Sequence, residues 1–297
     1  MTYLVTGATG FIGSRLVEHL ISRGDAVYYL ARKPSSKLPS QASFHPWDTK
    51  EKPELNALSR IDIIIHLAGE PIAQRWSDEV KKRIYDSRVD GTRRLVAAIR
   101  ELKHKPYALI SASAVGYYGD CGDEVVTEAT KPGTDFLAEV CRDWEREASR
   151  ARDLGLRVVP IRIATVLGRD GGALKKMLPA FRLGVGGAFG SGRQWMPWIH
   201  IDDLVRLFLF AGDNATINSA INGSSPEPVT NTQFTKTLGN VLHRPAFMPA
   251  PKLAMKLMLG EMADFLFTSL RVIPRAAEQA GFRFEYPTLE AALKASL

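Results

Sequence analysis

The chain has 297 residues, 45% of them hydrophobic, which suffices for one large α/β unit or two modest domains with a packed core. Its net charge of +7 suggests nucleic acid, but the basic residues are scattered among acidic ones and no nucleic-acid-binding motif occurs. Nucleic acid is therefore excluded as the main ligand, and anionic small molecules suit the excess of cations equally well.

The cysteines and the apolar runs indicate whether the chain has disulfides, a metal site or a membrane span. Cys121 and Cys141 are too few for a disulfide scaffold and lack metal-ligand spacing, so we expect no metal site. No apolar run approaches the ~20 residues of a membrane span, and the N-terminus enters a strand without a cationic flank or a cleavage site. We therefore expect a cytoplasmic protein without a membrane partner.

The first thirteen residues carry the strongest motif. An apolar run, residues 3–5, precedes glycines spaced three apart, and an apolar stripe at helical spacing follows. Between a strand and a helix, such glycines permit a tight turn, close approach of backbone N–H groups to a diphosphate, and close helix packing. The helix N-terminus adds the positive end of its dipole. The predicted dinucleotide contacts are Gly7, Thr9, Gly10, Phe11, Ile12 and Gly13.

A second buried strand is predicted over residues 26–31, and Ala31, Arg32 and Lys33 stand at its end. In a dinucleotide-binding fold, the residue about 20 positions past the glycines meets the adenosine ribose. An acid there selects NAD, whereas an arginine accommodates the 2′-phosphate of NADP. Arg32 occupies that place, so we predict NADP(H) as the cofactor. The alternative is that Arg32 and Lys33 only decorate a surface loop.

Strands and helices alternate through the first half of the chain. Apolar runs predict strands at 42–46, 61–67, 108–112 and 158–163, and helical spacing predicts a helix over 76–102. This alternation predicts an α/β fold with a doubly wound parallel sheet of the Rossmann type. We assign the NADP-binding domain to 1–168 with 196–225 contributing, and a smaller α+β substrate-side domain to 169–297, including a module at 249–297.

Parallel sheets bind ligands at the carboxyl ends of their strands, and in this chain those ends carry small or hydroxyl-bearing residues. The predicted cofactor contacts there are Leu67, Ala68, Gly69, Ser111 and Thr165. Arg88, on the predicted helix, is expected to face the cofactor, with surface ion pairing as the alternative. His66 is predicted to be a core histidine rather than a ligand.

Charge alternates over residues 142–147, which is typical of a solvated helix face. Farther on, the glycine-rich residues 183–192 are expected to form a lid or a substrate cradle. Asp202 and Asp203 precede an apolar helix predicted at 204–211, and an aspartate in that place is typical of an N-cap. Helical runs are also predicted at 231–242 and 251–259.

These residues resemble the extended short-chain dehydrogenase/reductases and, within them, the nucleoside-diphosphate-sugar epimerase relatives. The match runs through residues 6–13, 67–69, 111–119, 162–168 and 198–203. The blocks 111–118, 136–145, 189–203 and 249–297 resemble an atypical subgroup with a small extra C-terminal domain. That subgroup is sometimes labelled cell-division inhibitor and is related to a human NADP-binding member.

The resemblance implies a catalytic tyrosine with a lysine four positions later, and a serine or threonine at the preceding strand end. The lysine and the nicotinamide ribose lower the tyrosine pKa from about 10, so that it can exchange a proton during hydride transfer. Here Phe136 or Leu137 occupies the tyrosine position, and Val140 or Cys141 occupies the lysine position. The usual acid–base pair is therefore absent.

The resemblance assigns the catalytic serine to Ser113. A tyrosine on the same loop, Tyr117 or Tyr118, could approach the nicotinamide from the substrate side, and we take Tyr117 as the second catalytic candidate. The alternative is that these rings pack over the cofactor pocket.

Two functions of different classes fit these observations. One is an NADP(H)-binding, epimerase-like oxidoreductase that acts on a small, anionic or nucleotide-sugar substrate with a non-standard acid–base group. The other is a catalytically weak or inactive NADPH-binding regulatory protein. A small-molecule substrate is the expected partner, and a homodimer through two helices flanking the sheet rests on fold analogy.

Overall fold

Within the described residues, seven parallel strands form one central sheet. The structure is a computed structural model that describes residues 1–297 apart from 59, 249, 252–254 and 258–259. The strand order is β11-β7-β5-β4-β1-β2-β3. These strands are β1 (Thr2–Thr6), β2 (Ala26–Ala31), β3 (Ser43–Pro46), β4 (Ile63–His66), β5 (Ala108–Ala114), β7 (Arg157–Ile163) and β11 (Ile221–Gly223). Because all neighbouring pairs are parallel, their carboxyl ends meet at one edge.

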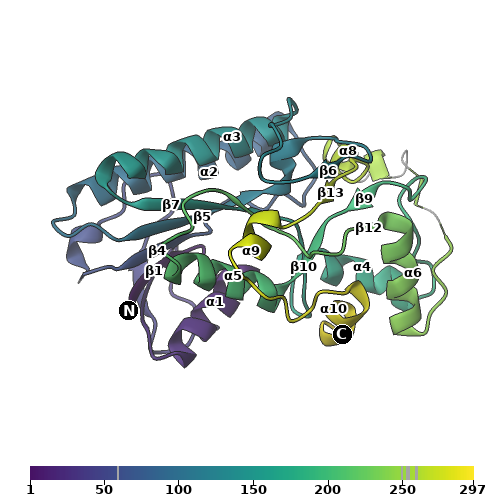
Figure 1. Ribbon diagram of the computed structural model, residues 1–297, viewed down its shortest axis with the longest axis horizontal. Coiled ribbons are helices and arrows are strands. Elements are labelled where there is room, and N and C mark those ends of the chain that lie inside the picture. The colour runs from purple at the N-terminus through teal and green to yellow at the C-terminus, as the bar shows by residue number, and fades with distance from the viewer. Residues whose placement is uncertain (59, 249, 252–254, 258–259) are drawn as a thin grey trace.

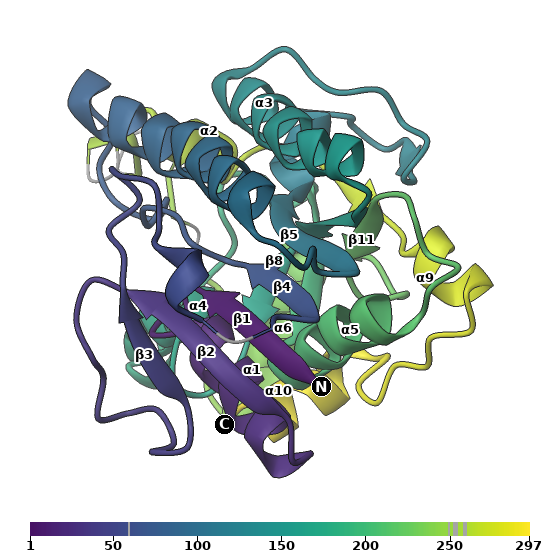
Figure 2. The same cartoon turned by 90° about the vertical axis from the view of Figure 1, so that its left-hand side faces the viewer.

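Helices cover both faces of this sheet (Figure 2). α1 (Phe11–Ser22) and α5 (Ile201–Asp213) pack on one face, and α2 (Asp78–Glu101) and α3 (Phe136–Ser149) pack on the other. Successive strand residues serve opposite faces, so Tyr3 and Val5 join the core with α1 and α5, whereas Leu4 joins the core with α2. The predicted doubly wound Rossmann fold is confirmed.

The order of the strands reverses between β1 and β4, because the chain builds outward from β1 in one direction and from β4 in the other. In doubly wound sheets, ligands bind in the crevice outside the carboxyl ends of the strands at such a switch point. The glycine-rich turn follows β1 at that place. Topology therefore puts the predicted diphosphate contacts where this fold binds ligands.

Shorter elements surround the carboxyl edge of the sheet (Figure 1). β8 (Thr165–Leu167) pairs with β10 (Trp198–His200), and β9 (Trp195–Met196) pairs with β12 (Val229–Thr230). The helices here are α4 (Gly172–Arg182), α6 (Asn231–Leu242), α8 (Met262–Phe265), α9 (Arg275–Gln279) and α10 (Leu289–Ala295). Short 3-10 turns are η1 (Leu55–Ala57), η2 (Val115–Tyr118) and η3 (Arg150–Leu154). Of the helix predicted at 251–259, residues 252–254 and 258–259 lie outside the described residues.

Residues 270–297, here called the strap, return across the Rossmann domain. Its strand β13 (Arg271–Val272) pairs with β6 (Val125–Val126), and the Glu128 carboxylate accepts hydrogen bonds from the N–H groups of Asn222 and Ala276. Farther along, the Asp203 carboxylate accepts from the N–H groups of Glu285 at 2.8 Å and Tyr286 at 2.9 Å. A half-buried carboxylate, Glu128, and a fully buried one, Asp203, therefore hold the end of the chain in place.

The prediction that an aspartate caps α5 is wrong. α5 begins at Ile201, and the His200 ring accepts the N-terminal hydrogen bond from the N–H of Asp202. An imidazole nitrogen can serve here because His200 is buried and its pKa is lowered by burial, which favours the neutral ring. The two aspartates of the first turn have other roles: Asp202 pairs with Arg15 at 2.7 Å, and Asp203 holds the strap.

Replacement of Asp203 tests the strap. Its carboxylate is fully buried and accepts from two backbone N–H groups and from Arg206 at 3.0 Å. We expect Asp203→Asn to lower the free energy of unfolding by about 2–3 kcal/mol, because the new amide cannot satisfy all of these donors. Denaturant unfolding with far-UV circular dichroism measures this change.

Asp202→Asn is the matched control. Its carboxylate pairs with the exposed Arg15, and surface pairs contribute at most about 1 kcal/mol. Equal destabilisation by the two variants would contradict the role assigned to Asp203.

Candidate functional site

The turn between β1 and α1 is shaped by backbone contacts that leave no room for side chains. Gly7 has a φ of +68°, and a Cβ atom there would lie 2.6 Å from the backbone of Leu67. A Cβ atom on Gly13 would lie 2.3 Å from the carbonyl oxygen of Gly7. Both distances are far shorter than van der Waals contact, so glycine is required at each position.

The first turn of α1 leaves unpaired donors at the carboxyl edge of the sheet. Gly10 is the N-cap and offers no side chain to the helix, and Thr9 and Gly10 are exposed. The N–H groups of the first helical residues therefore lack intrahelical partners. Together with the helix dipole, they form an anion site that fits a diphosphate.

Two predicted contacts, Phe11 and Ile12, are half-buried at the start of α1 and pack against the core. The Phe11 ring lies over the glycine turn that follows β8, where a Cβ atom on Gly171 would come within 2.5 Å of the ring. This packing fixes the direction of the first helical turn. The side chain of Phe11 thus has a structural role, and its backbone N–H is the group available to a ligand.

A buried hydrogen-bond chain joins β1, β4 and α2 directly beneath the turn. Thr6 Oγ1 accepts from the N–H groups of Leu67 and Ala68, and lies 2.6 Å from His66 Nδ1. His66 Nε2 lies 2.9 Å from Thr92 Oγ1. Complete burial, with the charge of Arg88 nearby, lowers the pKa of His66 to about 3. His66 is therefore a neutral core histidine with both ring nitrogens paired, as predicted.

The carboxyl ends of β2 and β3 form the other end of the site. A cavity of about 270 Å³ opens there, and its lining includes Arg32, Trp47, Asp48 and Glu51. The Arg32 side chain is exposed and makes no ion pair within the described part of the chain, whereas Lys52, in the same lining, is bound by Glu101 at 2.6 Å. Arg32 is therefore free to meet an anionic group. Ala31 ends β2, and Lys33 is exposed beside it.

Arg88 reaches the same strand edge from α2. The side chain is 9% exposed, and its Nη1 donates to the carbonyl oxygens of Glu70 at 2.9 Å and Ile84 at 3.4 Å. A Cβ atom on Gly69 would lie 3.0 Å from the guanidinium carbon, so the charge sits directly against the carboxyl end of β4. The alternative of surface ion pairing is wrong, because Arg88 is buried and forms no ion pair with the described residues.

Ser113 belongs to a buried polar network at the end of β5. Its hydroxyl donates to Glu145 Oε1 at 2.7 Å. Arg162 holds the same carboxylate through Nε at 2.9 Å and Nη2 at 3.0 Å, and its Nη1 donates to the Tyr118 hydroxyl at 2.9 Å. Tyr118 in turn donates to Asn222 at 2.6 Å. The hydroxyl proton of Ser113 is therefore committed to Glu145, which leaves the oxygen lone pairs for a ligand.

The prediction that residues 142–147 form a solvated face is wrong for the acidic side chains. Asp143 is 6% and Glu147 is 1% exposed, and Glu145 forms the pair with Arg162. The cause is packing, because α3 is covered by α2 on one side and by β5 on another. A signal was present: Glu145 lies four residues after Cys141 and eight after Leu137, so it shares their face of the helix.

The α3 residues at the superfamily's catalytic positions face two different neighbours. Phe136 packs edge-on to Trp76, and Val140 packs with Val80 and Ile84 of α2. Leu137 instead lies against Gly116 at the end of β5, where a Cβ atom on that glycine would be 3.3 Å away. The buried Cys141 lies beside Ser113 and Ala114, and burial raises the pKa of its thiol to about 12.

Tyr117 packs by the face of its ring. The guanidinium carbon of Arg162 lies 3.6 Å from the ring centroid, and the ring borders a small core that contains Leu270 and Val272 of the strap. Tyr118 is buried at 2% exposure, and burial raises the pKa of its hydroxyl. This geometry matches the alternative in which both rings pack, and a proton-transfer role for Tyr117 stays a prediction.

Ser111 and Thr165 lie at neighbouring points of the same edge. Ser111 stands opposite His66 in the register of β4 and β5, is 1% exposed, and donates to the carbonyl of Ala112 at 3.2 Å. Thr165 is half-buried at the start of β8. Adjacent strands thus gather most of the predicted contacts at one edge, and the two hydroxyl residues remain predicted cofactor contacts.

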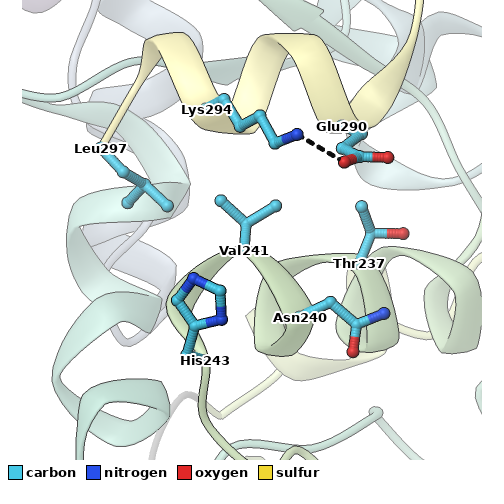
Figure 3. A pocket seen from close by; sticks show the side chains of 7 residues that line it. All are labelled: Thr237, Asn240, Val241, His243, Glu290, Lys294 and Leu297. Carbon is cyan, nitrogen blue, oxygen red and sulfur yellow. Dashed lines mark ion pairs between the residues drawn. The ribbon is translucent and has the colours of Figure 1, made fainter.

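A separate cavity of about 520 Å³ lies between α6 and α10 (Figure 3). Val241 and Thr237 point into it from α6, and on the opposite side Glu290 and Lys294 pair with each other along α10 at 2.7 Å. Neither helix contributes a residue to the glycine turn or to the Ser113 network. The cavity is therefore distinct from the candidate site.

Comparison with known proteins decides the family. Residues 3–222 match the model of the NAD dependent epimerase/dehydratase family, which covers most of the chain. The chain belongs to the NAD dependent epimerase/dehydratase family. Residues 250–296, which include most of the strap, match a domain of unknown function, DUF1731. The predicted resemblance to epimerase-like proteins with a small C-terminal domain is confirmed.

Three relatives place the chain within the epimerase/dehydratase family. An Arabidopsis thaliana protein, "Epimerase family protein SDR39U1 homolog, chloroplastic", is 42% identical over 99% of this chain and 86% of its own. The human epimerase family protein SDR39U1, solved with NADPH, has a TM-score of 0.90 and 35% identity over 100% of this chain and 99% of its own. A Corynebacterium glutamicum nucleoside-diphosphate sugar epimerase has a TM-score of 0.80 and 36% identity over 100% of this chain and 58% of its own.

None of the helices in the described part is long and apolar enough to cross a membrane. Nor do three or more His, Cys, Asp or Glu side chains gather there in a group that could hold a metal ion.

The pH dependence of stability tests the buried state of His66. Because its pKa in the folded protein is lowered from 6.5 to about 3, its contribution is fully present above pH 6.5 and is lost as the pH falls toward 3. We expect this group to cost about 1.4 kcal/mol of unfolding free energy per pH unit below 6.5.

Denaturant unfolding between pH 7 and 5 measures this slope, since few carboxylates titrate in that range. His66→Asn should show a shallower slope of unfolding free energy against pH than the wild type. His104→Asn, which alters an exposed histidine, should show the wild-type slope. Identical slopes for the wild type and His66→Asn would show that His66 is not held neutral by the fold.

Proposed function

We propose that this protein binds NADP(H) and uses it as an epimerase-like oxidoreductase on a small, anionic or nucleotide-sugar substrate. The observation that carries the proposal is a complete dinucleotide cradle, Gly7 to Gly13, at the same strand edge as the Ser113 hydroxyl. The human relative solved with NADPH supports the cofactor, and the named sugar epimerase supports the substrate class.

The residues present fit NADP(H) along its length. The N–H groups at the start of α1 would hold the diphosphate, and the exposed Arg32 would meet the adenosine 2′-phosphate. Gly69 leaves the carboxyl end of β4 open for the cofactor to pass. When bound, the nicotinamide ring supplies a hydride donor or acceptor.

Ser113 is the group we assign to the substrate. Since Glu145 accepts its proton and Arg162 fixes Glu145, the Ser113 oxygen is held in one orientation at the end of β5. It would accept a hydrogen bond from a substrate hydroxyl and so orient the carbon that exchanges hydride. Glu145 and Arg162 are positioning residues in this account.

The usual tyrosine and lysine are missing from this site. Leu137 and Cys141 are the α3 residues that face β5, and a thiol whose pKa is raised to about 12 stays protonated at neutral pH. The loss of general acid–base catalysis removes a factor of about 10²–10⁴ in rate. This observation favours the second candidate, an NADPH-binding regulatory protein with little or no turnover.

Turnover separates the two functions. We expect at least one compound in a panel of carbonyl compounds and oxidised nucleotide sugars to oxidise bound NADPH. The loss of NADPH fluorescence measures the rate of this oxidation. Ser113→Ala should lower that rate by about 100-fold because the substrate loses its orienting group. Tyr117→Phe tests the predicted proton-transfer role of Tyr117: a rate lowered by about 10²–10⁴ would support that role, and the wild-type rate would support the alternative in which the ring only packs. NADPH that persists with every compound would support the regulatory function.

Cofactor selection is tested at Arg32. We expect tighter binding of NADPH than of NADH, measured by isothermal titration calorimetry. Arg32→Ala should narrow the difference by about 1.5–3 kcal/mol, the scale of hydrogen bonds to a charged group. Lys37→Ala removes another exposed cation nearby and should change the difference in affinity between NADPH and NADH little. Equal affinities of the wild type for the two cofactors would refute the NADP assignment.

A further inference from the structure

Arg88 is a buried cation with most of its hydrogen-bonding capacity unused. Nη1 donates to two backbone carbonyls, and the described part of the chain offers no acceptor to Nε or Nη2. No carboxylate within it forms an ion pair with the guanidinium, although the side chain is only 9% exposed. A desolvated guanidinium without a counter-charge is costly, so its presence calls for a ligand.

The surroundings of Arg88 show where that ligand lies. One side of the guanidinium faces the ring of Trp144, with 5.2 Å between the guanidinium carbon and the ring centroid. Another side abuts Gly69, where a Cβ atom would lie 3.0–3.2 Å from the guanidinium atoms. Gly69 itself is exposed at the cofactor edge. The unused donors therefore lie at the border of the proposed dinucleotide site.

Arg88 and Cys141 also interact electrostatically. The charge of Arg88 acts on the Cys141 thiol, and that thiol lies beside Ser113. Cys141 is, with Val140, one of the two α3 residues that can occupy the position of the superfamily's lysine, and it is the one that lies beside Ser113. The Arg88 guanidinium on α2 is thus placed near the α3 position at which this chain lacks the superfamily's lysine.

We propose that Arg88 binds the hydroxyl groups of the nicotinamide ribose and supplies from α2 the positive charge that Cys141 cannot supply from α3. An arginine stays protonated at all working pH values, so it orients the ribose and stabilises negative charge without exchanging protons. This role rests on the proposed binding of NADP(H). It goes beyond that proposal because it assigns the nicotinamide half of the site to a residue outside the superfamily's catalytic positions.

Two ligands separate the two halves of the site. NADPH has both riboses, whereas 2′,5′-ADP has the adenosine half alone. By isothermal titration calorimetry, we expect Arg88→Met to weaken NADPH about 10- to 100-fold, the effect of losing charge-assisted hydrogen bonds. Its affinity for 2′,5′-ADP should equal that of the wild type. Arg32→Ala is the matched control and should weaken both ligands.

A purely structural role for Arg88 predicts a different pattern. If the guanidinium only braces the carbonyls of Glu70 and Ile84, Arg88→Met would weaken both ligands in parallel or neither, and either result would overturn the proposal. Arg88→Gln keeps a donor for these carbonyls but removes the charge, so it gives the same test should the methionine variant fail to fold. Thermal unfolding shows which variants are folded.

The charge can also be moved between the helices. Adding Cys141→Lys to Arg88→Gln should restore part of the lost NADPH affinity without changing the affinity for 2′,5′-ADP. If folded Arg88 variants bind NADPH as tightly as the wild type, the role of Arg88 is refuted while the proposed function stands. If the wild type binds neither ligand, the proposed function itself fails.

Discussion

The close approach of the Gly7 backbone to Leu67 and Gly13 is the constraint on which the rest of the site depends. It joins β1, β4 and α1 at the switch point of the sheet, with the start of α1 directed at the strand edge. Beneath it, the fully buried hydrogen-bond chain Thr6–His66–Thr92 ties β1 and β4 to α2 on the other face of the sheet. Any side chain at Gly7 or Gly13 would separate these elements and remove the diphosphate cradle.

In the proposed function, cofactor binding and chemistry are assigned to different parts of this fold. The cradle is made of backbone and glycine, so it persists whatever side chains α3 presents. The α3 face toward β5 carries Leu137 and Cys141, yet Glu145, which Arg162 holds in place, still accepts the hydrogen bond of the Ser113 hydroxyl and fixes it. With Arg88 beside them, these groups form an ordered polar centre that differs from the tyrosine–lysine arrangement of the superfamily.

Hydrophobic periodicity was enough to predict the sheet and its helices. Each apolar run of a strand and each apolar stripe of a helix indicates a buried face without reference to residues elsewhere in the chain. The predicted strand 26–31 and helix 231–242 match β2 and α6 residue for residue. The surroundings of charged side chains were harder to predict, since the burial of Asp143 and Glu147 and the pairing of Glu145 depend on partners far away in sequence. Glu145 meets Arg162 only after α3 docks on the sheet, and Asp203 meets the strap only after the last segment folds back.

A crystal structure of the protein with NADP⁺ bound tests the central claim most directly. The account predicts the diphosphate against the N–H groups of Phe11 to Gly13 at the start of α1, and a guanidinium nitrogen of Arg88 within about 3.2 Å of a hydroxyl oxygen of the nicotinamide ribose. A complex in which the diphosphate lies away from the glycine turn, or in which Arg88 makes only its two backbone contacts, would contradict it.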